Sequence, residues 1–199
     1  MRPAVGFVGI GRMGRPMVLR LLQAGYQVLA YDNHAVLREV VNAGARIAHS
    51  PAQVADTASV VCLCLPDAEA VMDVIGSSDG LSAGKQCSLV VDLSTIGPLG
   101  ACRAGSALAA YGIEYIDAPV SGGVHQASEG LLEIMVACRS NLFGGIKEIL
   151  GFFGKPFHVG ESYGQAQAVA CSNQLLGMGF HAIGRSEFVT AFSKGCDNR

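Results

Sequence analysis

The chain alternates short, continuously apolar runs with segments whose apolar residues recur at helical spacing. The first apolar run spans residues 4–8, and Met17, Val18, Leu21 and Leu22 follow at helical spacing. The run predicts a buried strand and the spacing predicts an amphipathic helix. Further strands are predicted at residues 27–31, 46–48, 59–65, 88–92, 113–116, 132–137 and 157–159. Further helices are predicted at residues 36–41, from 51, around 71–75, and at 98–111 and 141–153.

Repeated strand–helix units of this kind predict an α/β fold with a doubly wound, mostly parallel sheet. Strands in such a sheet are covered on both faces, which accounts for their unbroken apolar runs. Local signals mark some helix ends: Ser50 and Pro51 predict an N-cap and a first helical residue, and Gly44 predicts a left-handed residue after a helix. Ligands of such folds bind at the carboxyl ends of the strands.

The last part of the chain predicts one long helix. No proline interrupts the sequence from about Tyr163 to the early 190s. The apolar positions compatible with that helix are Val169, Leu176, Phe180, Ile183 and Phe188. Three glycines, Gly177, Gly179 and Gly184, each weaken it by about 1 kcal/mol relative to alanine, although the first two would also allow close helix packing.

Composition narrows the functional classes. The 199 residues are 50% hydrophobic and 15% charged, with a net charge of −2, so no basic surface for nucleic acid is expected. No apolar stretch reaches about eighteen residues, which argues against a membrane span. Seven cysteines form an odd set, several in apolar runs, and we expect reduced core thiols rather than disulfides or a metal site. That favours a cytoplasmic protein, with the mitochondrial matrix left open.

The turn after the first strand carries a glycine pattern typical of dinucleotide sites. Residues 9–14 read G-I-G-R-M-G, and the first helix follows directly. Gly9 allows a tight turn, Gly11 lets a pyrophosphate approach the backbone, and Gly14 lets the helix pack on the strand. The helix N-terminus then offers free N–H groups to the anion.

An acidic residue strengthens this interpretation. Asp32 ends the second strand about twenty residues past the glycines, where an acid accepts hydrogen bonds from the adenosine ribose. Its charge would repel a 2′-phosphate, which favours NAD as the cofactor and leaves NADP as the second choice. A glycine loop kept only for packing is the alternative, and the register of strand, helix and acid favours the dinucleotide site.

Three other stretches place polar groups where strands or the long helix would expose them. They are D-L-S-T-I-G-P at 92–98, D-A-P-V-S-G-G at 117–123, and S-N at 172–173. The two glycines of the second stretch could hold a carboxylate with backbone N–H groups. Taken singly, each stretch also fits a structural role, with Ser94, Thr95 or Ser121 as an N-cap and Asn173 as a core amide.

Together, and in this order, these stretches resemble the β-hydroxyacid dehydrogenase family, which includes 3-hydroxyisobutyrate dehydrogenases and tartronate semialdehyde reductases. The match covers G-I-G-R-M-G-R-P-M, the two D-initiated stretches and E-G-L-L-E-I-M-V, from residue 4 to about 190. The resemblance implies a Rossmann-type domain, here residues 1–161, followed by a long linking helix. Residues 162–199 would then begin an all-helical C-terminal domain that is truncated in this chain.

The resemblance also implies an activity and a set of site residues. We expect an NAD(P)-dependent oxidoreductase acting on a small 3-hydroxy acid or its semialdehyde, assembled as a homo-oligomer. The implied cofactor residues are Gly9, Ile10, Gly11, Arg12, Met13, Gly14, Asp32, Leu65, Pro66 and Thr95. The implied substrate carboxylate residues are Ser121, Gly122 and Gly123.

One departure concerns catalysis. The family carries a lysine on the linking helix as acid/base and an asparagine that orients it and the substrate. Alignment without gaps from residues 158–160 puts Val169 on the lysine and Asn173 on the asparagine. His125, Tyr163 or a water held by Asn173 are the candidate replacements. A family member that binds dinucleotide without dehydrogenase activity, as a sensor or scaffold, is the alternative function.

Overall fold

The computed structural model describes residues 2–33 and 37–186, with side chains described up to Leu175. The strands are β1 (Ala4–Val8), β2 (Gln27–Tyr31), β3 (Arg46–Ile47), β4 (Val60–Leu63), β5 (Leu89–Asp92), β6 (Glu114–Asp117), β7 (Val120–Ser121), β8 (Leu132–Ala137) and β9 (Gly154–Gly160). The helices are α1 (Gly14–Gln23), α2 (Arg38–Asn42), α3 (Pro51–Ala55), α4 (Ala68–Gly76), α5 (Gly97–Ala109), α6 (Val124–Glu129), α7 (Ser140–Gly151) and α8 (Gln165–Ser186), with a 3-10 turn at Leu81–Ala83.

Within the described residues the strands form one nine-stranded sheet, in the order β3-β2-β1-β4-β5-β6-β8-β7 with β9 pairing β8. Every pairing is parallel except those of β8 with β6 and with β7. The predicted α/β, mostly parallel, doubly wound fold is therefore confirmed. The order runs outward in both directions from β1 and β4, so the loops that follow these two strands meet at a switch point.

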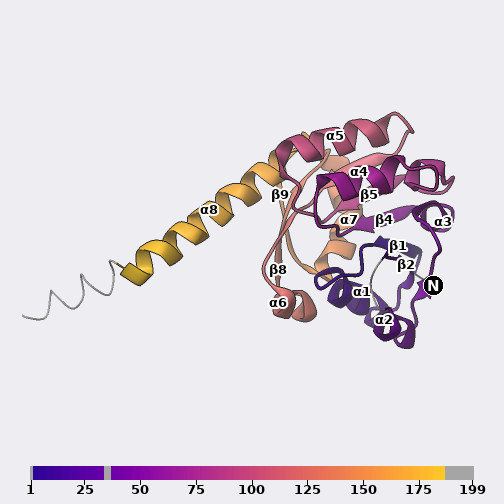
Figure 1. The fold of residues 1–199 in the computed structure, drawn as a ribbon, viewed down its shortest axis with the longest axis horizontal. Coiled ribbons are helices and arrows are strands. Elements are labelled where there is room, and N and C mark those ends of the chain that lie inside the picture. Colours follow the sequence, from indigo (N-terminus) through magenta and orange to yellow (C-terminus); the bar gives the residue numbers. More distant parts are fainter. Residues whose placement is uncertain (1, 34–36, 187–199) are drawn as a thin grey trace, which may run out of the picture.

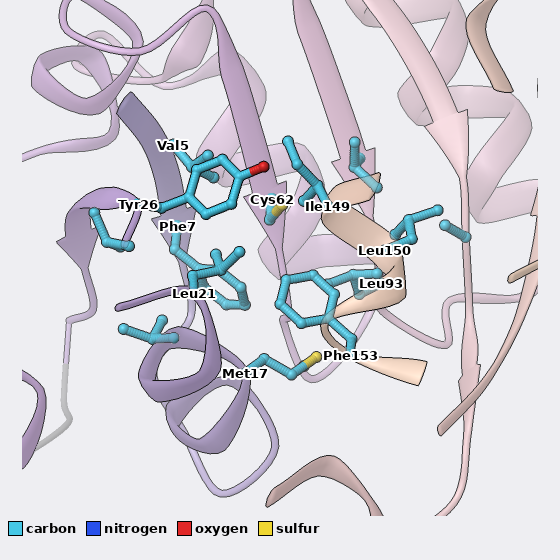
Figure 2. Close-up of a cluster of buried hydrophobic side chains, with 14 of the residues drawn as sticks. Val5, Phe7, Met17, Leu21, Tyr26, Cys62, Leu93, Ile149, Leu150 and Phe153 are labelled. Atoms are coloured by element: carbon cyan, nitrogen blue, oxygen red, sulfur yellow. The ribbon is translucent and has the colours of Figure 1, made fainter. Parts of the chain in front are cut away.

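Two apolar cores cover the two faces of the sheet. On one face Phe7 of β1 packs edge-on against Phe153, with 6.3 Å between ring centroids, and Met17 and Leu21 of α1 close over them (Figure 2). On the other face Leu63 belongs to a second buried cluster with residues of α3, α4 and α5. Strands placed between two cores need apolar side chains at successive positions, as the sequence pattern indicated.

Most predicted elements have close counterparts. Strands 27–31 and 132–137 have the predicted bounds. Ser50 is the N-cap of α3 and its hydroxyl accepts from the Gln53 N–H, while Gly44 after α2 has φ +106°. The strand predicted at residues 157–159 is too short, because β9 pairs in parallel with β8 from Gly154 to Gly160. The sequence pattern missed β7, α6 and the 3-10 turn, which are too short to show a period.

The long helix α8 is continuous from Gln165 to Ser186, through all three of its glycines. Its first turns pack on α5, β8 and β9, and the rest points away from the sheet (Figure 1). The predicted extension to the early 190s, with Phe188, lies outside the described residues. Across residues 2–33 and 37–186, no helix combines the length and hydropathy that a bilayer crossing needs.

Candidate functional site

The glycine turn between β1 and α1 is built as tightly as its sequence suggests. Gly9 has φ +95° and donates its N–H to the Tyr31 carbonyl at 2.9 Å. A Cβ atom on Gly9 would collide with the Cys64 carbonyl, and one on Gly14 would collide with the Gly9 carbonyl. A Cβ atom on Gly11 would meet nothing within 4 Å. Two of the glycines therefore permit the turn itself, whereas Gly11 leaves backbone open to a ligand.

The N-terminus of α1 offers its N–H groups beside this open backbone. Its N-cap, Met13, makes no side-chain hydrogen bond, and its first turn contains no acidic residue. The helix dipole adds partial positive charge at the same end. This is the arrangement that binds phosphate at a helix N-terminus.

Asp32 lies where β2 ends and reaches across to the glycine turn. Its Oδ2 accepts a hydrogen bond from the Ile10 N–H at 2.6 Å. The carboxylate thus holds the glycine turn in shape from the end of β2. Ile10 itself is buried, so its part in the site is played by its backbone.

These residues line one cavity of about 510 Å³. Every predicted cofactor residue except Ile10 lies on its wall, including Leu65 and Pro66 after β4 and Thr95 after β5. The cavity continues to Gly122 and to Gln174 of α8. Its size falls in the range of small-molecule and cofactor sites. Open backbone at Gly11, free N–H groups on α1 and an acid at the end of β2 together fit a dinucleotide.

The loop after β5 is fixed from both sides. Ser94 accepts a hydrogen bond at its Oγ from the Leu65 N–H at 2.9 Å, and donates its own N–H to Asp92 at 2.9 Å. The alternative role of Ser94 as a helix N-cap is therefore wrong, because Ile96 precedes α5 and Ser94 ties the loops after β4 and β5 together.

Two buried carboxyl groups stand side by side under this loop. Asp92 and Asp117 are register partners at the carboxyl ends of β5 and β6, and both are 0% exposed. Burial raises the pKa of Asp92 from 3.8 to about 6, although hydrogen bonds from Ser94 and Tyr115 work in the opposite direction. Burial also raises the pKa of Asp117, against hydrogen bonds from Gln167 and Gly164. Asp92 holds Ser94 and Asp117 holds Gln167, whereas neither carboxyl group lines the cavity itself.

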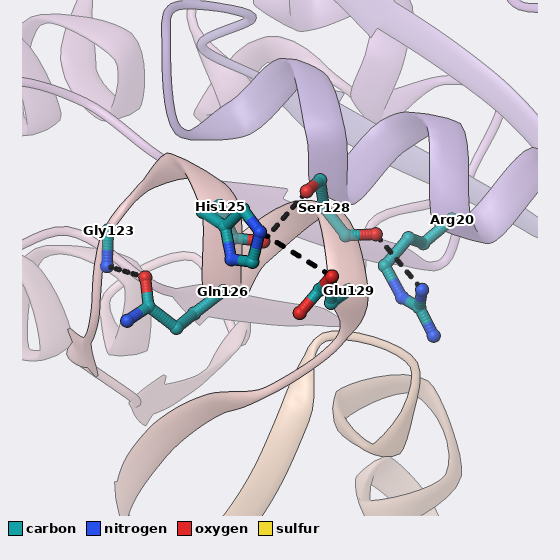
Figure 3. Close-up of polar contacts among 6 residues, drawn as sticks. All are labelled: Arg20, Gly123, His125, Gln126, Ser128 and Glu129. Atoms are coloured by element: carbon teal, nitrogen blue, oxygen red, sulfur yellow. Dashed lines mark hydrogen bonds and ion pairs between the residues drawn. The ribbon is translucent and has the colours of Figure 1, made fainter.

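The predicted carboxylate loop meets the long helix. Asn173 Nδ2 donates to Ser121 Oγ at 3.3 Å, which joins residues from the S-G-G and S-N stretches. Gly122 has φ +127° and lines the cavity. The Gly123 N–H already has an acceptor, Gln126 Oε1 at 3.0 Å, which ties the first turn of α6 back to its N-cap (Figure 3). A bound carboxylate would compete with Gln126 for that N–H.

Val169 faces a separate, mainly apolar hollow of about 430 Å³. Val169 lies one helical turn before Asn173, which also lines the hollow. Met135, Phe157 and Val159 form its walls. The Val169 side chain is 40% exposed. Among the described residues on the walls of this hollow and of the larger cavity there is no lysine.

Two of the three candidate replacements for that lysine lie elsewhere. His125 points to Glu129, with 3.5 Å between Nε2 and Oε1, and its side chain is 80% exposed (Figure 3). Tyr163 packs edge-on against Tyr115, with centroids 5.4 Å apart, on the wall of a different cavity. Of the three candidates, only Asn173 lies at the predicted site. Cys64 on the cavity wall is not a nucleophile, because burial raises its pKa to about 12.

Sequence reasoning missed two glutamines of α8. Gln174 lines the cavity, and Gln167 bonds to the loop after β5. Neither belongs to a motif, and a glutamine in a predicted helix ordinarily indicates an exposed face. The one available signal for Gln167 was its position between apolar alanines at helical spacing.

Comparisons with known proteins agree with this geometry. A family model described as the NAD binding domain of 6-phosphogluconate dehydrogenase matches residues 4–168. A 2-(hydroxymethyl)glutarate dehydrogenase from Eubacterium barkeri is 38% identical over 175 residues, covering 86% of this chain and 58% of that protein. The mitochondrial 3-hydroxyisobutyrate dehydrogenase of Rattus norvegicus is 37% identical, covering 92% of this chain and 55% of that protein. The chain therefore spans somewhat more than half the length of these relatives.

Solved structures give the same picture. A 3-hydroxyisobutyrate dehydrogenase of Mycobacterium tuberculosis, described with L-serine, superposes with a TM-score of 0.88 at 30% identity, over 98% of this chain and 67% of that one. A complex of Psf3 with NADP+ and 2-OPP gives a TM-score of 0.83 at 32% identity, over 97% of this chain and 69% of that one.

Proposed function

The chain belongs to the β-hydroxyacid dehydrogenase family and contains its NAD-binding domain, and on that premise we propose that it oxidises a small 3-hydroxy acid, or reduces its semialdehyde, with NAD(P). One observation carries the proposal. The glycine turn, Asp32 and the loops after β4 and β5 share a single cavity, and that cavity reaches Gly122 of the carboxylate loop. A cofactor and a small carboxylate would therefore lie next to each other.

Each part of the cavity has a proposed task. Residues 9–14 and the N-terminus of α1 bind the pyrophosphate, and Asp32 binds the adenosine ribose. Leu65, Pro66 and Thr95 border the nicotinamide end. The bound cofactor supplies the hydride chemistry at its nicotinamide ring. The protein must orient the substrate carbon and exclude water around it.

The carboxylate loop and Asn173 would hold the substrate. We assign Ser121, Gly122 and Gly123 to the carboxylate, with Gln126 leaving the Gly123 N–H when the substrate binds. Asn173 bonds to Ser121 at 3.3 Å, which supports a shared role of the two side chains at the substrate. Val169 occupies the family's lysine position and can neither donate nor accept a proton.

A second candidate function rests on Val169. A chain that binds dinucleotide and a small carboxylate but turns over very slowly would act as a sensor or scaffold. The absence of lysine among the described residues that line the two hollows favours this reading of the present chain. Both functions need the same ligand site, so cofactor binding does not separate them.

Steady-state oxidation of NADH and NADPH with a panel of small semialdehydes separates them. The dehydrogenase proposal expects substrate-dependent turnover for at least one semialdehyde that carries a carboxylate. Saturable NADH binding without turnover on any member of the panel would favour the sensor or scaffold. Failure to bind NADH or NADPH would contradict both.

Three coarser assignments complete the proposal. Residues 1–161 form the dinucleotide-binding domain, and residues 162–199 begin an all-helical domain, which the protruding α8 supports. A homo-oligomer is proposed because α8 carries exposed apolar side chains, including Leu175 at 70%. A cytoplasmic location is proposed because the six described cysteines are all free thiols, Cys196 lying outside the described residues.

A further inference from the structure

We propose that Gln167 is a positioning residue that fixes the nicotinamide end of the cavity by joining α8 to the loop after β5. The inference rests on the proposed binding of a nicotinamide cofactor and assigns to this glutamine a task of its own. Gln167 lies on the first turn of α8 and is 0% exposed. A buried amide is costly unless its hydrogen bonds are made, so its presence there calls for a physical reason.

All four side-chain hydrogen-bonding positions of Gln167 are used. Its Oε1 accepts from the N–H groups of Ile96 and Gly97, each at 3.0 Å. Its Nε2 donates to the Ser94 carbonyl and to Asp117 Oδ1, each at 3.0 Å. A glutamine amide has two acceptor positions and two donor hydrogens, so no valence is left over.

The network also fixes which way the amide points. Turned over, its Nε2 would face the two N–H donors and its Oε1 would face two acceptors. Four favourable contacts would become four repulsive ones, so the loop and the helix accept only one arrangement. Asp117 reinforces it, because its Oδ2 accepts from the N–H groups of Gly164 and Gln167 at 3.0 and 3.3 Å.

The two parts joined by Gln167 both contribute residues to the wall of the cavity. Ser94 and Thr95 line it from the loop after β5, and Gln174 lines it from α8, about two turns beyond Gln167. Asn173, the neighbour of Gln174, bonds to Ser121. A shift of α8 relative to the loop would therefore move one wall of the cavity and the substrate side together.

The adenosine end of the cavity is built independently of Gln167. Asp32 directly follows β2, and β1 and β4 separate that strand from β5. Asp32 bonds to Ile10 of the glycine turn, and the residues that Gln167 contacts belong to the loop after β5 and to β6. Loss of Gln167 is therefore expected to weaken binding of the nicotinamide half and to spare the adenosine diphosphate half.

Calorimetry with NADH and with ADP-ribose, which lacks the nicotinamide, tests this on the full 199-residue chain. In Gln167→Glu the second carboxylate oxygen would face the Ser94 carbonyl and Asp117, both acceptors. Gln165→Glu is the matched control, since Gln165 is exposed and its Oε1 accepts only from the nearby Ser162 N–H among the bonds described. Gln167→Asn is a second, uncharged variant. Its side chain is one methylene shorter, so it cannot reach both the loop after β5 and Asp117.

Both Gln167 variants are expected to lose about tenfold or more in NADH affinity while ADP-ribose affinity stays within about twofold. The Gln165→Glu control is expected to match the wild type for both ligands. Equal losses for the two ligands, or no loss of NADH affinity in a folded variant, would overturn the assignment. A wild type that binds neither ligand would instead contradict the proposed function.

Amide hydrogen exchange of the wild type tests the bonds without any variant. The Ile96 and Gly97 amides are expected to exchange slowly, because both donate to a buried oxygen. Fast exchange at both positions would overturn the positioning role even if neither variant folds.

Discussion

At the scale of single residues, the empty space beside Gly11 is the feature that we propose admits the pyrophosphate to the turn. A side chain at this position would fill the approach to the backbone without disturbing the fold, because its Cβ atom meets nothing within 4 Å. Gly11→Val is therefore expected to abolish the fluorescence enhancement of NADH and to leave the unfolding midpoint nearly unchanged. Gly144→Val on α7 is the control, since its Cβ atom also meets open space. Retained NADH binding in Gly11→Val would place the pyrophosphate elsewhere.

Asp32 has two tasks that different substitutions can separate. Its charge would disfavour a 2′-phosphate, and its Oδ2 accepts from the Ile10 N–H at 2.6 Å. Asp32→Asn keeps an acceptor for Ile10, so we expect it to lower NADH affinity and to narrow the gap to NADPH. Asp32→Ala removes both and is expected to weaken both cofactors further. Titrations that show a wild-type preference for NADPH would contradict the reading of this residue.

Val169 is the residue that we propose to occupy the position of the family's lysine. Val169→Lys would put an amine into an apolar hollow beside Asn173, and Glu133 on the same hollow could pair with it. If proton transfer is what the chain lacks, turnover of a semialdehyde should rise about 10²-fold with little change in substrate binding.

Ala168→Lys, one residue earlier on the exposed face of α8, is the control for added charge. Brisk wild-type turnover that Val169→Lys leaves unchanged would show that the acid/base lies elsewhere, and the sensor or scaffold function would be excluded.

At the scale of elements, the buried carboxyl groups at the ends of β5 and β6 make the free energy of unfolding depend on pH. The pKa of Asp92 is raised by burial from 3.8 to about 6 in the folded chain. Its contribution to stability is therefore fully present below about pH 4 and is lost as the pH rises through about 6. The linked free energy is about 3 kcal/mol.

Asp92→Asn removes this titration, and Tyr115 can rotate its hydroxyl to accept from the new amide. The stability of the variant relative to the wild type should therefore increase between pH 4.5 and 8, as measured by urea unfolding. Gln86→Ala at an exposed, uncharged position changes no titratable group and should show a constant difference. A constant difference for Asp92→Asn as well would mean that burial does not raise the pKa of Asp92 in the folded chain.

The elements that the sequence predicts well are those with a period long enough to see. Strands β2 and β8, the caps at Ser50 and Gly44, and the glycine turn all follow from local spacing and local chemistry. By contrast, β7 has two residues and exists only because β8 pairs with it. No pattern within two residues could announce it.

The candidate site divides in the same way. The glycine turn and Asp32 follow from spacing alone, whereas Ser121 and Asn173 are 52 positions apart and bond only after folding. Their association came from family resemblance rather than from physics. Neither spacing nor family resemblance predicts Gln167, because its role depends on four hydrogen-bond partners from two distant segments.

At the scale of the whole molecule, α8 is the helix through which we propose that the chain assembles. The helix leaves the sheet with Leu175 70% exposed, and the apolar positions Leu176, Phe180 and Ile183 continue along it, although their side chains are not described. Apolar surface of this kind tends to be covered by a partner. Sedimentation across the micromolar range should therefore show a homodimer or larger assembly through residues of about 165 to 192.

Leu175→Lys is expected to shift that assembly toward the monomer. Leu99→Lys is the matched control, because Leu99 on α5 is 82% exposed and lies on another helix. A monomeric wild type with α8 folded would contradict the proposed assembly.

A small tilt of α8 at its first turn also produces a large displacement at its far end. From its clamp at Gln167 to Ser186 it extends about 28 Å, so a tilt of about 5° at the root would swing the tip by about 2.5 Å. The buried side chains that fix its first turn are Gln167 of α8 and Asp117 at the end of β6. The position of any residue attached to the far end of α8 therefore depends on how rigidly the helix is held at Gln167, next to the cofactor cavity.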